Sequence, residues 1–278
     1  MTSRVRDARR TGEPPPLPEP LTVPVLDSHA HLDLMDGDVE QVLAAARSVG
    51  IDTVVQVGVD LPSSRWSADL AARHEAVHAA VALHPNEAGQ GAATDEALRE
   101  VELLAALPQV KAVGETGLDF FRTPGADGQR LQEESFRAHI AIAKATGTTL
   151  VIHDRDAHDD VVRVLLDEGA PDRVVFHCFS GGPALARICA EHGWWASFAG
   201  PVTFKANDDL RAAVAATPVE LLLVETDAPF LTPMPYRGRP NAPYLVPLTV
   251  RAMAQARGLE VDALCTAIAD NGRRAFAL

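Results

Sequence analysis

Short apolar, β-branched runs alternate with longer amphipathic stretches of helical period along most of this chain. This alternation constrains the fold more than any other feature of the sequence. The apolar runs cover residues 25–29, 52–59, 77–83, 110–114, 149–153, 173–177, 194–199 and 221–226. Eight strand–helix units in about 250 residues predict a (β/α)8 barrel of the TIM type. A doubly wound open sheet would need a glycine-rich phosphate loop after its first strand, and the sequence has none there.

The alternation covers residues 25–278, which we predict to form a single domain. Residues 1–24 are rich in arginine, proline and glutamate. Such a segment can neither continue a helix nor bury a core, so we expect a disordered extension. It has no apolar segment of the signal-peptide type, and no apolar run approaches the length of a membrane span. We therefore expect no membrane contact.

The cysteine content and the charge limit the compartment and the partners. Three cysteines without a C-x-x-C pair favour a reducing, cytoplasmic location. The formal net charge of −13 argues against tight binding along duplex nucleic acid, where many phosphates must be neutralised. The acidic residues are unevenly spread, because residues 235–278 carry six arginines against three acidic residues. Composition excludes a protein that coats DNA, but it does not exclude an enzyme that cuts one phosphodiester bond at a time.

Side chains able to bind metal ions gather at the ends of the predicted strands, where a barrel of this type holds its active site. Six of them form a nitrogen and oxygen donor set: His29, His31, Glu115, His153, His177 and Asp227. His29 and His31 are alternate residues of a strand, so they face the same side. Such donors suit Zn, Mn, Mg, Fe or Co. Six donors exceed the needs of one catalytic ion with an open position, so we predict two divalent ions bridged by Glu115.

One histidine at a strand end is usually a packing residue, and an acidic residue after a strand usually caps the next helix. The structural needs of a barrel do not place all these groups on successive strand ends. We therefore interpret the whole pattern as an active site.

Five segments resemble, in order and spacing, the signature segments of the TatD family, which are metal-dependent deoxyribonucleases of the amidohydrolase superfamily. They are residues 27–32 (DSHAHL), 82–85 (ALHP), 114–119 (GETGLD), 177–181 (HCFSG) and 225–229 (ETDAP). The likeness continues to the C-terminal region, including Asn271 and Phe276. It implies a TIM-type barrel that hydrolyses phosphodiester bonds of DNA at single-stranded ends, commonly with Mg²⁺ or Mn²⁺. The donor set also permits Zn²⁺.

The resemblance also implies roles for individual residues. The six donors correspond to the metal shell, and His84 resembles a residue near the scissile phosphate. We expect three catalytic residues: Glu115 as the bridge, Asp227 to orient the attacking water, and His84 to stabilise charge. The expected substrate-binding residues are Lys205, Arg237, Asn241 and Arg155. Asp119 is expected to orient a ligand histidine.

The segment 235–243 resembles the Arg-Gly segment of the family, and it keeps Arg237 and Asn241. It departs from the family pattern at Pro240, where a second basic residue is frequent, and at Ala242, where an acidic residue is frequent.

Two other functions fit part of the pattern. The same site could hydrolyse an ester or amide, such as a lactone or an aminoacyl-RNA, because folds and ligand sets are shared across reactions. The basic residues Lys205 and Arg237 favour a phosphate substrate. A non-catalytic binding protein with this fold would be expected to lack a ligand, and none is missing. We see no sign of an obligate protein partner and expect a monomer.

Overall fold

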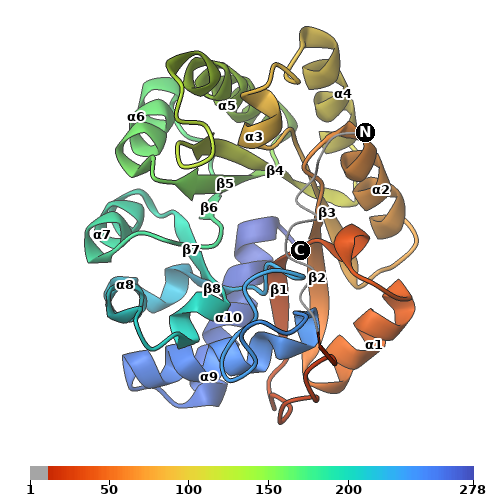
Figure 1. The fold of residues 1–278 in the computed structure, drawn as a ribbon, viewed down its shortest axis with the longest axis vertical. Helices are drawn as coiled ribbons and strands as arrows, with labels where there is room; N and C mark the ends of the chain where they lie inside the picture. Colours follow the sequence, from red (N-terminus) through yellow and green to blue (C-terminus); the bar gives the residue numbers. More distant parts are fainter. Residues whose placement is uncertain (1–11) are drawn as a thin grey trace.

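The computed structural model describes residues 12–278 and shows eight parallel strands in a nearly closed barrel, in the order β1 to β8. Helices surround this inner ring of strands (Figure 1). The strands are β1 (Val25–Ala30), β2 (Ile51–Val57), β3 (Val77–Val81), β4 (Val110–Asp119), β5 (Thr149–Arg155), β6 (Val174–Phe176), β7 (Trp195–Phe198) and β8 (Leu222–Val224). Each overlaps one of the predicted apolar runs, so the predicted TIM-type barrel is confirmed.

A helix follows each strand along the chain, and additional short helices lie in the connections. The α-helices are α1 (Val39–Ser48), α2 (Leu61–Ala71), α3 (Pro85–Ala88), α4 (Asp95–Ala105), α5 (Ala126–Thr146), α6 (His158–Glu168), α7 (Pro183–His192), α8 (Asp208–Ala216), α9 (Val246–Arg257) and α10 (Val261–Phe276). Four 3₁₀ helices are η1 (Leu32–Leu34), η2 (Gly200–Thr203), η3 (Val219–Leu221) and η4 (Pro243–Leu245). Local signals set several helix starts. For example, Asp60 forms a capping box with Ser63 before α2, and Thr94 caps α4.

Contacts between β1 and the segment after β8 bring the two edges of the sheet together. Ala30 and Ala228 form an isolated parallel bridge. The buried carboxylate of Asp27 accepts a hydrogen bond from the Thr226 backbone N–H at 2.9 Å and another from the Thr226 hydroxyl. These bonds fix the position of the segment after β8 relative to β1.

Strand β4 is longer than the sequence predicts, because it continues from residue 114 to Asp119. The apolar run that predicts this strand covers residues 110–114, and two glycines, Gly114 and Gly117, lie where the strand continues. In the structure both glycines allow close approach of β5: an ideal Cβ at Gly114 would lie 2.5 Å from the Val151 Cβ, and one at Gly117 would lie 2.1 Å from the His153 carbonyl oxygen. Glu115 consequently lies inside the strand.

The N-terminal extension differs in part from the prediction of disorder. Residues 1–11 lie outside the described residues. Residues 12–24 run in an extended conformation along the domain, and Pro15 and Leu21 are buried. The Leu21 N–H donates to the Val49 carbonyl at 3.0 Å. The prediction of disorder is therefore wrong for residues 12–24, because proline carbonyl groups accept hydrogen bonds from the domain and two apolar side chains are buried. Among the described residues, no helix is long and apolar enough to cross a membrane.

Candidate metal centre

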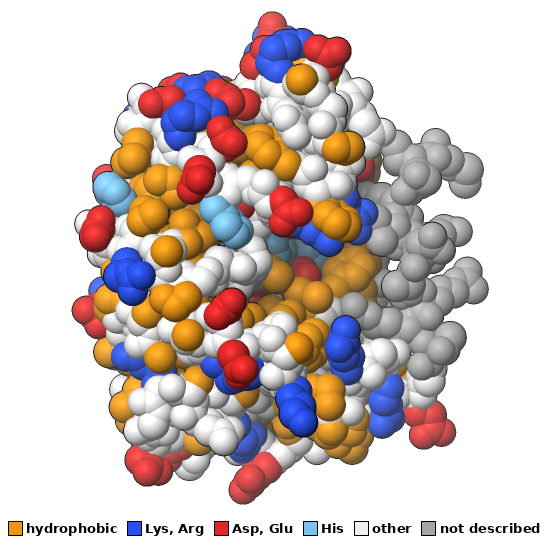
Figure 2. Space-filling view, turned by 60° about the vertical axis from the view of Figure 1, so that its left-hand side comes forward, with side chains coloured by type: hydrophobic (Ala, Val, Ile, Leu, Met, Phe, Trp, Pro, Cys, Tyr) orange, Lys and Arg blue, Asp and Glu red, His pale blue; other side chains and the backbone are white. Residues whose placement is uncertain are grey.

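The six predicted donors meet on one side of the barrel, at the carboxyl ends of the strands. Three lie within strands and three lie shortly after strands: His29 in β1, Glu115 in β4, His153 in β5, His31 after β1, His177 after β6 and Asp227 after β8. Figure 2 shows a hollow in this face, with histidine and acidic side chains in its depth. The parallel topology explains this convergence, because all eight strands point their carboxyl ends the same way.

Four donor atoms surround one small space beside β1. His29 Nε2 and His31 Nε2 lie 3.3 Å apart. Glu115 Oε2 lies 3.6 Å from His29 Nε2 and 3.8 Å from His31 Nε2. Asp227 Oδ1 lies 3.9 Å and 3.5 Å from the same two atoms. Donors held about 2.1 Å from one ion in tetrahedral geometry are about 3.4 Å apart, so these spacings fit a divalent cation.

The other carboxylate oxygen of Glu115 faces a second group of donors. Glu115 Oε1 lies 2.6 Å from His153 Nδ1, 3.0 Å from His177 Nε2 and 3.4 Å from His84 Nε2. Burial would raise the pKa of Glu115, but the charge of His177 and the hydrogen bond from His153 hold it well below its usual range. The carboxylate is therefore ionised, with each oxygen directed at a different set of histidines. This arrangement suits a ligand shared by two ions.

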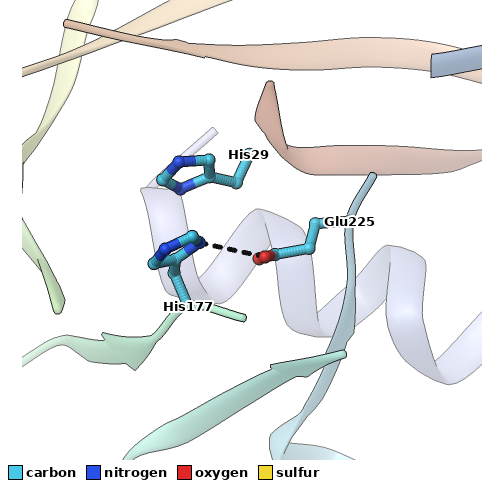
Figure 3. Close-up of side chains that lie close together, drawn as sticks. All are labelled: His29, His177 and Glu225. Atoms are coloured by element: carbon cyan, nitrogen blue, oxygen red, sulfur yellow. Dashed lines mark hydrogen bonds and ion pairs between the residues drawn. The ribbon is translucent and has the colours of Figure 1, made fainter. Parts of the chain in front are cut away.

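Glu225 belongs to the site, although the sequence analysis did not single it out. Its Oε1 lies 3.0 Å from His177 Nδ1 and accepts a hydrogen bond from the Cys178 N–H at 2.8 Å. Figure 3 shows His177 stacked on His29 and directed at Glu225, and the two rings lie 3.7 Å apart between centroids. The bond to Glu225 orients His177 so that its Nε2 faces Glu115.

A usable signal for Glu225 was present in the sequence. Glu225 and Asp227 have the same two-residue spacing as His29 and His31, which in an extended segment would place both side chains on one side. In the structure Asp227 departs from the extended conformation, with a φ of 53°.

Two buried polar atoms here have no hydrogen-bond partner among the described residues: His29 Nδ1 and Glu225 Oε2. Leaving a buried polar atom without a partner costs free energy, so such atoms are uncommon. His29, His177 and Glu225 each offer one donor atom within 4.8 Å of the others. These two unpartnered atoms, together with the imidazole and carboxylate groups around them, fit a site for metal ions.

Asp119 occupies the orienting position expected for it. Its Oδ2 lies 3.2 Å from His153 Nε2, while His153 Nδ1 faces Glu115. Burial would lower the pKa of His153, but its hydrogen bonds to Asp119 and Glu115 raise it to about 9. The protein thus holds this ring in one orientation between two carboxylates.

His84 is oriented as a hydrogen-bond donor rather than as a further ligand. The Asn86 backbone N–H donates to His84 Nδ1 at 3.0 Å, so the ring proton must be on Nε2. Burial lowers the pKa of His84, which favours the neutral ring. His84 therefore presents an N–H group beside Glu115.

Of the basic residues expected to bind substrate, Arg155 is the last residue of β5, whereas Lys205 and Arg237 lie in loops. The Arg155 guanidinium carbon lies 4.0 Å from the centroid of the exposed Phe121 ring. The Arg237 guanidinium carbon lies 4.6 Å from the Phe204 ring centroid. Stacking of this kind restricts the guanidinium groups. Lys205 is exposed in the loop that follows η2, next to Phe204.

Asn241 is not placed as a substrate ligand. It is 1% exposed, and its side-chain amide donates to the carbonyls of Thr226, at 2.9 Å, and Phe230. Its Oδ1 accepts a hydrogen bond from the Ala242 N–H at 3.0 Å. Both amide hydrogens are used within the protein, so we assign Asn241 to anchoring the loop after β8 instead of contacting a phosphate.

Comparison with known proteins shows which proteins this chain resembles. A family model described as "TatD related DNase" matches residues 26–277. An uncharacterized metal-dependent hydrolase, TatD, of Mycobacterium tuberculosis is 46% identical over 261 residues, which cover 91% of this chain and 98% of the relative. A Klebsiella pneumoniae protein named "3'-5' ssDNA/RNA exonuclease TatD" is 32% identical over 252 residues, covering 87% and 92% of the two chains.

A similar fold is also found among solved structures. The crystal structure of a TatD homologue, YJJV, from Escherichia coli superimposes with a TM-score of 0.85 at 26% identity. The match covers 91% of this chain and 98% of the other.

Proposed function

Because the chain belongs to the family of TatD-related DNases and is a metal-dependent hydrolase, we propose that it removes nucleotides from the 3′ ends of single-stranded DNA. The observation that carries this proposal is the placement of Glu115, whose two oxygens face two separate donor groups. Sites for two metal ions typically serve phosphoryl-transfer reactions. The name of the Klebsiella relative supports both the substrate and the polarity.

The donors divide into two sets, one for each of two ions, Mg²⁺ or Mn²⁺. Glu115 would be shared, with His29, His31 and Asp227 on one side and His153 and His177 on the other. When bound, such ions polarise a phosphate oxygen and lower the pKa of a water molecule.

Asp227 is the proton acceptor in this mechanism. Burial would raise the pKa of its carboxyl, but the hydrogen bond from His31 and the nearby histidine charges lower it, so the carboxylate is ionised. Asp227 takes a proton from the attacking water as the water oxygen bonds to phosphorus. The bond from phosphorus to the 3′ oxygen of the remaining strand then breaks, and that oxygen takes up the proton held by Asp227. Asp227 has a φ of 53°, a strained conformation that directs its side chain into the site.

His84, Arg155 and Arg237 bind the phosphate groups. The Nε2–H of His84 donates to an oxygen of the scissile phosphate and stabilises the charge that develops there. Arg155 and Arg237, held by Phe121 and Phe204, make contacts to flanking phosphates. Lys205 adds a further positive charge on the same side as Arg237.

The direct test uses a single-stranded oligonucleotide labelled at its 5′ end, incubated with the purified protein and Mg²⁺ or Mn²⁺. We expect a ladder of products shortened from the 3′ end, which a chelator abolishes. Asp227→Asn is expected to lower kcat by about 100-fold or more, because it removes the proton acceptor. Asp172→Asn is the matched control, since Asp172 is an exposed carboxylate just before β6, at the opposite end of the barrel.

Two results would count against the proposal. Activity that survives in Asp227→Asn would come from a contaminating nuclease. A protein that hydrolyses an ester or lactone panel but releases no nucleotides would support the alternative of an esterase or amidase with the same site.

A further inference from the structure

The N-terminal strap, which we define as residues 12–20, makes specific hydrogen bonds to the C-terminal third of the chain. Arg239 Nε donates to the Glu13 carbonyl at 2.8 Å, and Arg239 Nη2 donates to the Pro14 carbonyl at 2.9 Å. The Tyr244 hydroxyl donates to the Pro15 carbonyl at 2.7 Å, and this proline is buried. At the other end of the strap, Arg251 Nη2 donates to the Glu19 carbonyl at 2.9 Å.

The composition of the strap suits this mode of binding. An extended proline-rich segment forms no internal hydrogen bonds, so its carbonyl groups are available as acceptors. Proline also restricts the free chain, which lowers the entropy lost when the segment docks. The strap precedes residues 26–277, the part of the chain that the family model matches.

The strap contacts the loop that carries one of the proposed phosphate-binding residues. We call residues 232–241 the arginine loop, and it holds both Arg237 and Arg239. Within it, the Thr232 hydroxyl donates to the Arg239 carbonyl at 2.6 Å, and the Arg239 N–H donates to the Tyr236 carbonyl at 3.0 Å. The Arg239 guanidinium carbon lies 5.3 Å from the Tyr236 ring centroid.

Asn241 anchors the far end of this loop to the segment after β8. Glycine at position 238, with a φ of 93°, makes the backbone between the two arginines easy to deform.

We propose that the strap is a positioning element for substrate: by binding Arg239 and Tyr244, it fixes the arginine loop and thereby holds Arg237 where it meets a flanking phosphate. This inference rests on the proposed function for its substrate. Arg237 is exposed and stacks on Phe204, so the position of its guanidinium depends both on Phe204 and on what holds the backbone of the loop. The metal donors lie on the barrel strands and do not depend on the strap.

The test loosens the strap within the full chain. Tyr244→Phe removes the hydroxyl that binds Pro15 but keeps the ring, and Pro15→Gly makes the strap more flexible. We expect each variant to raise KM for a single-stranded oligonucleotide about three- to tenfold, with little change in kcat. Hydrolysis of bis(p-nitrophenyl) phosphate, which is too small to reach Arg237, is expected to stay unchanged. Thr22→Val is the matched control, because it removes a hydrogen bond to Asp262 farther along the same segment.

A second readout does not depend on activity. Trypsin cleaves after arginine, and the Arg237–Gly238 bond lies in the arginine loop. We expect trypsin to cut this bond several-fold faster in Tyr244→Phe and Pro15→Gly than in the wild type or Thr22→Val, as measured by mass spectrometry. Equal cleavage rates in all four proteins would overturn the role of the strap. If the wild type cleaves no DNA, the proposed function fails, and the trypsin rates still decide whether the strap holds the loop.

Discussion

At the scale of single residues, the histidines of this protein show how burial and partners divide one residue type into different roles. His84 and His153 face the donor cluster, whereas His139 is buried in α5 beneath it. His139 Nδ1 donates to the Ser135 carbonyl at 2.7 Å, and its Nε2 accepts a hydrogen bond from the Leu83 N–H at 3.1 Å. This neutral ring supports the backbone immediately before His84.

His139 is expected to make the protein sensitive to acid. Burial lowers its pKa to about 4 from an ordinary value of 6.5. Below pH 6.5 the unfolded chain takes up a proton that the folded protein excludes, so stability falls as the pH drops from 6.5 towards 4. The loss between pH 7 and pH 5 is about 2 kcal/mol.

Urea unfolding at these two pH values checks this expectation. In His139→Gln the amide oxygen can still accept from Leu83, but it does not titrate. The variant should have a lower free energy of unfolding than the wild type at pH 7. On going to pH 5, its free energy of unfolding should fall by about 2 kcal/mol less than that of the wild type. Equal losses in the two proteins would contradict the assignment.

The sequence predicts most of the candidate site because its signals are local. The His-x-His pair and the acidic residues at strand ends are visible without coordinates, and the structure brings all six donors together. The spacing of Glu225 from Asp227 marks it as a candidate, but neither its role nor that of Asn241 could be predicted in this way. Their roles depend on the path of the chain after β8, where Asp227 and Leu231 adopt positive φ angles that no residue pattern indicates.

At the scale of elements, the close approach of β4 and β5 determines where Glu115 and His153 meet. Gly117 has a φ of 134°, and an ideal Cβ there would lie 2.1 Å from the His153 carbonyl oxygen. The apolar run that predicts β4 ends at Gly114, and glycine normally weakens strands. The same glycines continue the strand here, because only they allow β5 to come so near.

Gly117→Ala is therefore expected to disturb the pairing of β4 with β5. We expect a loss of about 2–4 kcal/mol in the free energy of unfolding, from the clash and from the positive φ. We also expect weaker metal binding, because His153 would move away from Glu115. Urea unfolding and calorimetric titration with Mn²⁺ measure the two effects.

Gly125→Ala serves as the control for this substitution. Gly125 has a φ of −89°, and an added Cβ there would meet nothing within 4 Å. Gly125→Ala should lower the free energy of unfolding much less than Gly117→Ala does, and it should leave metal binding unchanged. Similar losses in the two variants would show that the approach of the strands is not what Gly117 permits.

At the scale of the whole molecule, the excess of arginines over acidic residues in 235–278 serves mainly to hold the structure together. Arg239 and Arg251 bind carbonyls of the strap, Arg257 binds the carbonyl of Val214 at 2.7 Å, and Arg274 binds the carbonyl of Glu220 at 2.7 Å. The sequence shows these charges but not their partners, because backbone carbonyls look alike in any sequence. Arg237, in contrast, is exposed and stacks on Phe204.

Metal binding should stabilise the whole fold, because the donors come from strands around the barrel. A metal at 100 times its Kd adds about 2.7 kcal/mol, which corresponds to a rise of about 5 °C or more in Tm. Thermal unfolding with Mn²⁺ and with a chelator measures this shift. In Glu115→Gln, which alters both donor groups, the metal should raise the Tm by less than half as much as in the wild type. An equal shift in the variant would mean that the metal binds elsewhere.

The closure of the barrel between β1 and the segment after β8 also has a consequence for biosynthesis. His29 and Asp227 lie at opposite ends of the domain in sequence, yet their donor atoms are 3.9 Å apart. A nascent chain on the ribosome holds only part of this site until residue 227 has emerged from the exit tunnel. The candidate metal centre is therefore assembled only late in translation.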